Sequence, residues 1–225
     1  MISSVVERFV HIEDVRSSNL LSPTILTVRR NLVDAGKMAQ FPTILGLRHG
    51  ETEWNREGRF QGGFDSSLTP LGRRQAGDQR AILQQLDLSG YQWFCSPQPR
   101  AVATAQIVKG GSSEFYLEPS LREIAMGDWA GRSRAEIAAV NRDLDLAGLA
   151  VYWHLPGGET PGDVAKRVEA FLERLSGPAV IVTHGVTLRL LACVYFGRDL
   201  VEFGMFPADH GVVYRLDPSG FQELT

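Results

Sequence analysis

The chain has 225 residues, of which 44% are hydrophobic and 22% are charged. This balance is typical of a globular domain with a buried core, and it excludes wholesale disorder. The formal net charge of −3 and the isoelectric point near 6.0 argue against a broad basic surface. We therefore expect no nucleic-acid partner, although a small cationic pocket is compatible with both values.

The two cysteines, Cys95 and Cys193, lie in apolar segments. Two are too few for a disulfide scaffold, so we interpret them as buried thiols in a reducing compartment. No apolar stretch reaches the length of about 18 residues that a membrane-spanning helix needs, and the N-terminus lacks the basic and apolar regions of a secretory signal. We therefore expect a cytoplasmic protein without a membrane partner.

The first segment of the chain differs from the rest. A helix is predicted over residues 22–36, because a serine, a following proline and a terminal glycine frame apolar residues at helical spacing. We expect residues 1–37 to form an N-terminal extension, helical or partly ordered, that could pair two subunits into a homodimer. Residues 38–225 are expected to form the catalytic domain. An alternative is that translation begins at Met38.

Short apolar runs alternate with helical patterns from residue 42 onward. In chain order, the pattern predicts strand 42–47, helix 69–86, strand 91–96, helix 99–108, strand 114–119, helix 132–144, an aromatic and glycine-rich loop 151–160, helix 161–175, strand 178–183, helix 186–197 and strand 211–217. Strands that alternate with helices in this way predict a three-layer α/β/α sandwich with a mostly parallel central sheet.

Arginines and histidines follow several predicted strands. Arg48 and His49 come after the first strand, Arg100 opens the helix after the second, and His184 follows the fourth. Because ligands of open α/β sheets bind beyond the carboxyl ends of the strands, we expect these four side chains to meet at one edge of the sheet.

Such a group of side chains suits a phosphate ester. A guanidinium presents a rigid fork of donors that matches phosphate oxygens, and a neutral imidazole is a competent nucleophile whose pKa is lowered by neighbouring cations. A carboxylic acid, for which Glu123 and Asp128 are available, could protonate the leaving group. Gly50 and Gly185 would allow the backbone to approach the anion closely.

The stretch LRHGETEWNREGRFQGGFDSSLTPLGRRQA (47–76) resembles the signature region of the histidine phosphatase, or phosphoglycerate mutase-like, family. The resemblance continues in order through SPQPRAVATA (96–105), LREIAMGDWAG (121–131), PGGET (156–160) and VTHG (182–185), and it covers about residues 42–217. It implies the fold of that family and a reaction that needs neither a metal nor another cofactor.

The resemblance also implies roles for individual residues. His49 would be transiently phosphorylated, and Glu123, rather than Glu118 or Asp128, would protonate the leaving group and later accept a proton from water. The implied catalytic residues are Arg48, His49, Arg100, Glu123 and His184, and the implied phosphate contacts are Arg48, Asn55, Arg100, His184 and Gly185.

Two positions depart from the family pattern. Gly46 stands where the family usually has a large aliphatic residue, and Asp209 and His210 stand where an asparagine is expected. Both departures affect the fine geometry of the pocket rather than its chemistry.

Other histidines and aromatic residues have simpler interpretations. His11, His154 and His210 are interpreted as structural or rim residues, because no pair has the short spacing of a zinc site. Tyr152 and Trp153 could belong to a lid over the substrate or could pack the loop that contains them.

A hydrolase and a mutase share this kind of pocket. The segment between Glu123 and PGGET is short, and LREIAMGDWAG is more similar to phosphatases than to mutases. We therefore predict a metal-independent phosphomonoester hydrolase, a phosphatase of the histidine acid type, that acts on a small phosphorylated metabolite. The alternatives are phosphoglycerate mutase-type phosphoryl transfer and a non-catalytic phosphate-binding protein.

Overall fold

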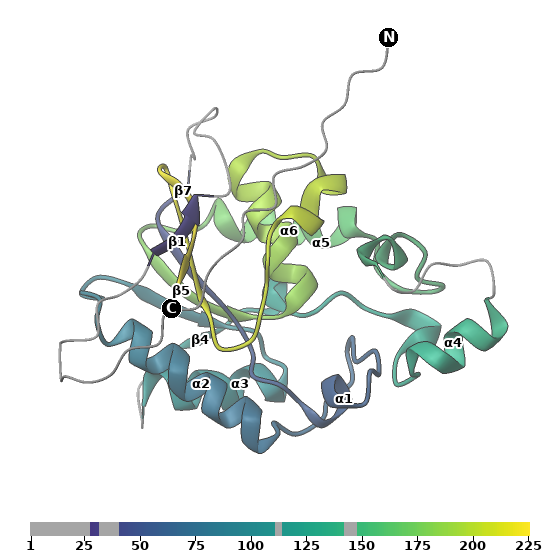
Figure 1. Ribbon diagram of the computed structural model, residues 1–225. Helices are drawn as coiled ribbons and strands as arrows, with labels where there is room; N and C mark the ends of the chain where they lie inside the picture. The colour runs from purple at the N-terminus through teal and green to yellow at the C-terminus, as the bar shows by residue number, and fades with distance from the viewer. Residues whose placement is uncertain (1–27, 32–40, 111–113, 142–147) are drawn as a thin grey trace, which may run out of the picture.

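The computed structural model describes residues 28–31, 41–110, 114–141 and 148–225, with the backbone alone for residues 28–31 (Figure 1). Within these residues one sheet has the strand order β1-β7-β6-β2-β5-β3-β4. The strands are β1 (Val28–Asn31), β2 (Ile44–Arg48), β3 (Gln92–Cys95), β4 (Tyr116–Leu117), β5 (Ala179–Thr183), β6 (Val213–Asp217) and β7 (Gly220–Leu224). Strands β2, β5, β3 and β4 are parallel to one another. On the other side of β2, strand β6 pairs antiparallel with β2, β7 with β6, and β1 with β7.

Helices cover both faces of this sheet (Figure 1). Helices α2 (Pro70–Leu83) and α3 (Pro99–Lys109) lie on one face, and α5 (Pro161–Leu172) and α6 (Gly185–Phe196) lie on the other. The short helices α1 (Glu53–Arg56) and α4 (Arg134–Val140) lie beyond one end of the sheet. The 3₁₀ helices are Pro119–Leu121, Gly127–Trp129, Leu149–Trp153 and Leu200–Met205. The predicted three-layer sandwich with a mostly parallel sheet is confirmed.

The core follows the alternation of side chains along the central strands. Ile44 and Ile181 belong to the buried cluster on the α5–α6 face, whereas Leu45 and Val180 belong to the cluster on the α2–α3 face. Strands β2 and β5 are buried on both faces, which explains their nearly continuous apolar sequences. This rigid centre fixes the carboxyl ends of both strands, where the candidate site lies.

Most predicted helices begin at their expected caps. Thr69 accepts a hydrogen bond from the backbone N–H of Gly72 at 2.9 Å, and Thr160 caps α5 in the same way. A proline occupies the first turn of both α2 and α5. Helix α6 ends at Gly197, whose φ of 60° is the left-handed conformation that glycine adopts readily.

The N-terminal segment differs from the prediction. The helix predicted over residues 22–36 is wrong at Val28–Asn31, which form β1 and pair antiparallel with β7. Strand β7 offers an unpaired edge there, and pairing satisfies backbone groups that a local helix would leave exposed on the sheet. The remainder of residues 1–37 lies almost wholly outside the described residues, so the division at residue 38 stays a prediction.

Other differences concern length. The strand predicted over residues 114–119 is only Tyr116–Leu117, and the helix predicted over residues 132–144 is Arg134–Val140, with residues 142–147 outside the described part. Strand β7 was not predicted, because the turn at Pro218 and Ser219 separates only a short terminal segment from β6.

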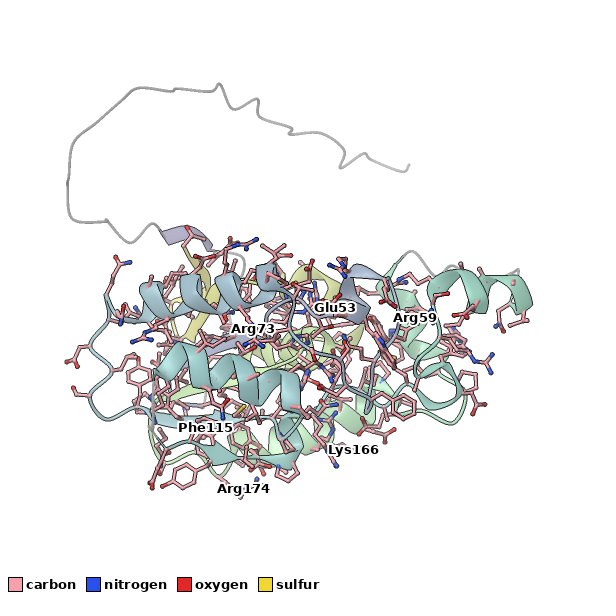
Figure 2. All side chains as sticks on the ribbon, turned by 90° about the horizontal axis from the view of Figure 1, so that it is seen from below. Glu53, Arg59, Arg73, Phe115, Lys166 and Arg174 are labelled. Atoms are coloured by element: carbon pink, nitrogen blue, oxygen red, sulfur yellow. The ribbon has the colours of Figure 1, made fainter. Side chains whose placement is uncertain are left out.

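Charged side chains such as those of Lys166 and Arg174 lie exposed at the surface (Figure 2). Arg73 is an exposed residue of α2 (Figure 2). Cys95 and Cys193 are buried free thiols, and burial raises the pKa of each to about 12. In the described part of the chain, no helix has the length and apolar character needed to cross a membrane.

Candidate active site

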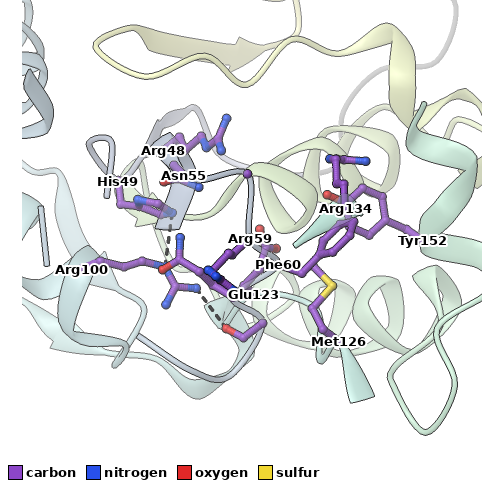
Figure 3. Close-up of a pocket in the computed structure, with 13 residues that line it drawn as sticks. Arg48, His49, Asn55, Arg59, Phe60, Arg100, Glu123, Met126, Arg134 and Tyr152 are labelled. Carbon is purple, nitrogen blue, oxygen red and sulfur yellow. Dashed lines mark hydrogen bonds between the residues drawn. The ribbon is translucent and has the colours of Figure 1, made fainter. Parts of the chain in front are cut away.

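A cavity of about 160 Å³ lies beyond the carboxyl ends of β2 and β3 (Figure 3). Its lining residues are Arg48, His49, Asn55, Gly58, Arg59, Phe60, Gln61, Gly62, Arg100, Glu123, Met126, Arg134 and Tyr152. Five of the seven candidate residues, Arg48, His49, Asn55, Arg100 and Glu123, therefore meet there. His184 and Gly185 are not among the lining residues, and they lie directly behind this wall.

The imidazole of His49 is held in one orientation and one tautomer. Its Nε2 lies 3.3 Å from Nε of Arg100, which can only donate, so Nε2 must be the unprotonated nitrogen. The proton is then on Nδ1, which donates to the carbonyl oxygen of Gly50 at 2.7 Å. The arrangement keeps a lone pair on Nε2, which accepts from Arg100 in the empty site and would be available for nucleophilic attack once a phosphate oxygen takes over that donor.

The surroundings also keep His49 neutral. Its side chain is buried, and burial together with the charges of Arg100 and Arg48 lowers its pKa well below the usual value. The backbone of His49 is fixed on two sides. Its N–H donates to the carbonyl of Thr183 at 2.9 Å, and its carbonyl accepts from Nδ1 of His210 at 2.6 Å.

Arg100 is the most firmly held side chain of the group. It is buried, and its terminal nitrogens donate to the carbonyl of Phe64 at 2.8 Å and to that of Gly62 at 3.0 Å. The carboxylate of Asp65 accepts from NH1 at 3.0 Å and from the backbone N–H of Arg100 at 3.2 Å. The loop of residues 62–65 therefore fixes the guanidinium beside His49.

Arg48 and His184 carry buried polar atoms without partners. One terminal nitrogen of Arg48 donates to the carbonyl of Ala208 at 2.9 Å, but its Nε has no partner among the described residues. Nδ1 of His184 is also buried and has no partner there. A buried donor without an acceptor is costly, so an anion that brings oxygen atoms would satisfy Nε of Arg48, and would satisfy Nδ1 of His184 in the tautomer that carries its proton there.

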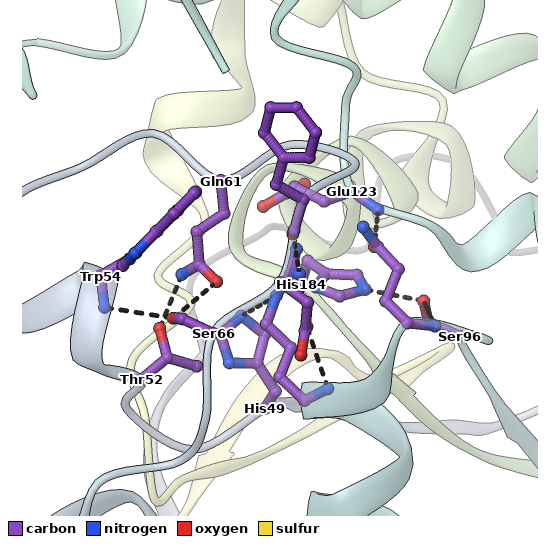
Figure 4. Close-up of polar contacts among 12 residues, drawn as sticks. His49, Thr52, Trp54, Gln61, Ser66, Ser96, Glu123 and His184 are labelled. Atoms are coloured by element: carbon purple, nitrogen blue, oxygen red, sulfur yellow. Dashed lines mark hydrogen bonds and ion pairs between the residues drawn. The ribbon is translucent and has the colours of Figure 1, made fainter. Parts of the chain in front are cut away.

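His184, the residue before α6, packs its ring against that of His49 (Figure 4). The two ring centroids lie 5.1 Å apart, and Nε2 of His184 is hydrogen-bonded to Oγ of Ser96 at 2.7 Å. Burial and the charges of Arg100, His49 and Arg48 lower the pKa of His184 well below its usual value. Gly185 lies against Arg48, since a Cβ placed there would be 3.2 Å from the guanidinium carbon.

Glu123 is the acidic side chain among the lining residues. Its carboxyl oxygens accept from the backbone N–H groups of Val186 and Thr187 at 3.2 and 3.1 Å, at the N-terminus of α6. The alternatives lie elsewhere. Glu118 accepts from Arg174 and from the N–H of Ser120, and Asp128 does not line the cavity. The preference for Glu123 agrees with this geometry.

Asn55 belongs to a small polar network at the rim. Its Oδ1 accepts from the N–H and the hydroxyl of Thr52 at 3.1 and 3.0 Å, which leaves the amide nitrogen as a donor. Thr52 also accepts from Nε2 of Gln61 at 2.7 Å (Figure 4). This network fixes the position of Asn55 at the start of α1.

Two glycines permit close packing, and for Gly50 this differs from the expected approach to an anion. A Cβ at Gly50 would lie 2.1 Å from the carbonyl oxygen of Gly72, so Gly50 permits close packing of the backbone against α2 rather than an approach to an anion. A Cβ at Gly46 would lie 2.6 Å from a methyl group of Leu188. Gly46 thus makes room for α6 on the strand that carries Arg48.

Several residues of the site were not predicted. Arg59, Phe60 and Arg134 line the cavity without any sequence feature that singles them out, and Tyr152 joins them from the loop for which a lid was one interpretation. His210, interpreted as a structural residue, contacts the backbone of His49. In the parts of the chain that the structure describes, no three His, Cys, Asp or Glu side chains are arranged to hold a metal ion.

Comparison with known proteins agrees with this geometry. A family model described as "Histidine phosphatase superfamily (branch 1)" matches residues 44–223. Phosphoserine phosphatase 1 of Hydrogenobacter thermophilus is 31% identical over 178 residues, which cover 74% of this chain and 82% of that protein. Glucosyl-3-phosphoglycerate phosphatase of Mycolicibacterium vanbaalenii is 31% identical, with 68% and 74% covered. The crystal structure of the alpha-ribazole phosphatase from Shigella flexneri superimposes with a TM-score of 0.69 and 27% identity, and covers 80% of this chain and 93% of that one.

Proposed function

The chain belongs to the histidine phosphatase superfamily (branch 1), and on that premise we propose that it hydrolyses phosphate monoesters through a phosphohistidine formed at His49. The relatives named above are phosphatases, which supports hydrolysis as the reaction. The substrate class is proposed to be a small phosphorylated metabolite, because the cavity is small and polar at its inner end.

The observation that carries the proposal is the lone pair of His49. Nε2 is unprotonated, faces Arg100 and lies in the cavity wall, while two neighbouring buried nitrogens, Nε of Arg48 and Nδ1 of His184, lack partners among the described residues. A phosphoryl group placed against Nε2 would supply acceptors to these groups. Electrostatic complementarity of this kind stabilises the charge that develops on the phosphoryl oxygens.

The first step is in-line attack. Nε2 of His49 forms a bond to phosphorus while the bond from phosphorus to the ester oxygen breaks. Protonated Glu123 donates its proton to the departing oxygen, so the alcohol leaves in its neutral form. The positive charge on the phosphorylated imidazole is balanced by the phosphoryl oxygens, which Arg48 and Arg100 hold.

The second step reverses these roles. The carboxylate of Glu123 accepts a proton from a water molecule, whose oxygen attacks phosphorus as the bond to Nε2 breaks. Inorganic phosphate is released, and His49 returns to its neutral tautomer with the proton on Nδ1. The hydrogen bonds from Val186 and Thr187 hold the carboxyl group in place for both proton transfers.

The test is hydrolysis of p-nitrophenyl phosphate by the purified protein in excess chelator. The proposal expects turnover that resists the chelator, disappears in His49→Ala, and persists in His154→Ala, a matched control at an exposed position outside the cavity. Turnover that needs a metal, or that survives in His49→Ala, contradicts the mechanism. Phosphoryl transfer to a second alcohol without release of phosphate would instead favour a mutase.

A further inference from the structure

The register of the sheet brings Ser96 beside His184. Strands β3 and β5 pair in parallel with Cys95 opposite Val182, so the residues that follow both strands lie together at the carboxyl edge of the sheet. The N–H of Ser96 donates to the carbonyl of Val182 at 2.9 Å and fixes the backbone there. The hydroxyl of Ser96 thereby reaches Nε2 of His184, with 2.7 Å between the oxygen and the nitrogen (Figure 4).

Both side chains of this pair are held in a dry environment. Ser96 and His184 are fully buried, so water does not compete for their hydrogen bonds. The loop that follows Ser96 is also fixed. The side chain of Gln98 donates to the carbonyl of Gly62 at 2.6 Å and accepts from the N–H of Glu123 at 2.8 Å. In such a place, the position of each proton has a large effect on the free energy.

The hydrogen bond between Ser96 and His184 can run in two directions. Oγ of Ser96 already accepts from the N–H of Gln98 at 3.3 Å. The hydroxyl proton of Ser96 needs an acceptor of its own, and within the described residues Nε2 of His184 is the atom in reach. If the hydroxyl donates to Nε2, the neutral imidazole carries its proton on Nδ1.

The number of unsatisfied buried groups favours this direction. When Ser96 donates, one buried group of the pair, Nδ1–H of His184, lacks a partner in the empty site. In the reverse direction, the hydroxyl proton of Ser96 and the lone pair on Nδ1 would both lack partners, at a greater cost. Burial, with the charge of Arg100 next in importance, lowers the pKa of His184, so a ring that carries both protons is not the resting form.

The same direction suits an anion at His49. The rings of His184 and His49 have their centroids 5.1 Å apart, and Nδ1 of His184 is the nitrogen that still has no partner. An oxygen of a phosphoryl group at His49 would accept from Nδ1–H and complete the hydrogen bonds of His184. With the other tautomer, the lone pair on Nδ1 would repel the same oxygen.

We propose that Ser96 is a positioning residue that fixes the tautomer of His184: its hydroxyl donates to Nε2, so that Nδ1 carries the proton and donates to the phosphoryl group. This inference rests on the proposed function, because it concerns how the same site holds the group that is transferred. Ser96 itself does not touch the substrate.

The tautomer can be measured in the ligand-free protein, without turnover. NMR spectroscopy gives the chemical shifts of both ring nitrogens in protein with labelled histidine, and the signals of His184 are those lost in His184→Asn. The wild-type ring is expected to be neutral, with the proton on Nδ1. Ser96→Ala should move the proton to Nε2 in part or completely, whereas Ser96→Thr, which keeps a hydroxyl, should retain the wild-type tautomer.

A second buried hydroxyl provides the matched control. Oγ1 of Thr183, the residue before His184, donates to the carbonyl of Leu121 at 2.7 Å and not to the imidazole. Thr183→Val removes this hydrogen bond and should leave the tautomer of His184 unchanged. A proton on Nε2 in the wild-type protein, an unchanged tautomer in Ser96→Ala, or an equal change in Thr183→Val overturns the inference.

Binding of inorganic phosphate tests the second half of the inference. Titration with phosphate, followed by the same NMR signals, gives a dissociation constant that does not depend on activity. Ser96→Ala should raise this constant by about 2- to 10-fold, as for the net loss of one hydrogen bond. An unchanged constant would mean that Nδ1 of His184 does not bind the phosphoryl group, and would overturn this half.

The outcomes separate the two proposals. If the wild-type protein hydrolyses p-nitrophenyl phosphate through His49 but Ser96→Ala keeps the wild-type tautomer, the role of Ser96 is wrong and the phosphatase proposal stands. If Ser96 determines the tautomer but the wild-type protein hydrolyses no phosphate ester, the proposed function fails, and the catalytic purpose of the tautomer fails with it.

Discussion

Nε–H of Arg100 is directed at Nε2 of His49 across 3.3 Å, inside a buried pair. Because arginine has no acceptor, this contact determines which nitrogen of His49 is free to react. A phosphate oxygen that enters the cavity would take over this donor and release the lone pair for attack. Arg100 therefore prepares the nucleophile in the empty site and would hold the phosphoryl group in the occupied one.

Asp65 should be needed to keep Arg100 in this position. Its carboxylate binds both the backbone and the guanidinium of Arg100, and no other carboxylate among the described residues pairs with Arg100. We expect Asp65→Ala to lower kcat/KM for p-nitrophenyl phosphate by about tenfold or more, as for the loss of a charged hydrogen bond. Asp78→Ala, an exposed position on α2, is the control. Equal activity of both variants would contradict this prediction, and would show that the carbonyls of Phe64 and Gly62 are sufficient to hold Arg100 in place.

The stability of the protein should depend on its buried histidines. Burial lowers the pKa of His49, His184 and His210 in the folded state, in the case of His210 to about 3. An unfolded histidine titrates near pH 6.5, so below that pH the unfolded chain binds more protons and the free energy of unfolding falls. The fall can reach about 1.4 kcal/mol per pH unit for each such histidine.

Denaturant unfolding at pH 7.5 and pH 5.0 measures this loss. His210→Asn keeps a donor for the carbonyl of His49 but has no titrating group, so the variant should lose less stability between these pH values than the wild-type protein. The same loss in both proteins would mean that His210 titrates normally in the folded state.

Glu159 should act as a positioning residue for Glu123. Its carboxylate accepts from the backbone N–H of Ala125 at 2.8 Å and pairs with Arg167, which also donates to the carbonyl of Ser120. These contacts hold both ends of the segment that carries Glu123. Glu159→Ala should therefore lower kcat more than it raises KM, since the phosphate contacts are unaffected.

A comparison of two esters with different leaving groups tests the role of Glu159 more specifically. An alkyl phosphate needs protonation of its oxygen more than p-nitrophenyl phosphate does, so Glu159→Ala should slow the alkyl ester by the larger factor. Glu169→Ala, exposed on α5, serves as the control. Equal slowing of both esters would indicate a general loss of structure rather than a misplaced acid.

The two glycines of α2 should respond in opposite ways to alanine. A Cβ at Gly72 would lie 2.0 Å from the carbonyl oxygen of Glu51, whereas a Cβ at Gly77 would meet nothing within 4 Å. Gly72→Ala should lower the free energy of unfolding by about 1–3 kcal/mol or more, through overpacking. Gly77→Ala should raise it by about 0.5–1 kcal/mol, because alanine favours a helix interior. Thermal unfolding of both variants tests this, and a stabilised Gly72→Ala would contradict the close packing beside Gly50.

The parts of the site that the sequence could predict are those attached to regular elements. Arg48, His49 and His184 lie at the ends of apolar strands, and Arg100 opens the helix after β3, so the rule for ligands at strand ends brings them together. The order of strands and helices is enough to predict that these residues share one pocket, and hydrophobic periodicity predicts that order well.

The remaining residues come from segments without such periodicity. Tyr152 lines the cavity from a 3₁₀ helix and Arg134 from the first turn of a short helix, whereas Asp65 holds Arg100 from a loop. Their neighbours in space are far from them in sequence. Strand β1 was mistaken for a helix because the sheet edge that stabilises it is formed by residues near the other end of the chain. Tertiary contacts of this kind override local propensity.

The measurement that tests the account most directly is trapping of the phosphorylated protein. The enzyme is mixed with a labelled phosphate monoester, quenched within the first turnover in alkaline denaturant and mapped by mass spectrometry. The account predicts one phosphoryl group on Nε2 of His49, because Nδ1 is occupied by its bond to Gly50. The label should be absent from His49→Ala. A phosphoryl group on another residue or on Nδ1, or full turnover with no trapped intermediate, would contradict it.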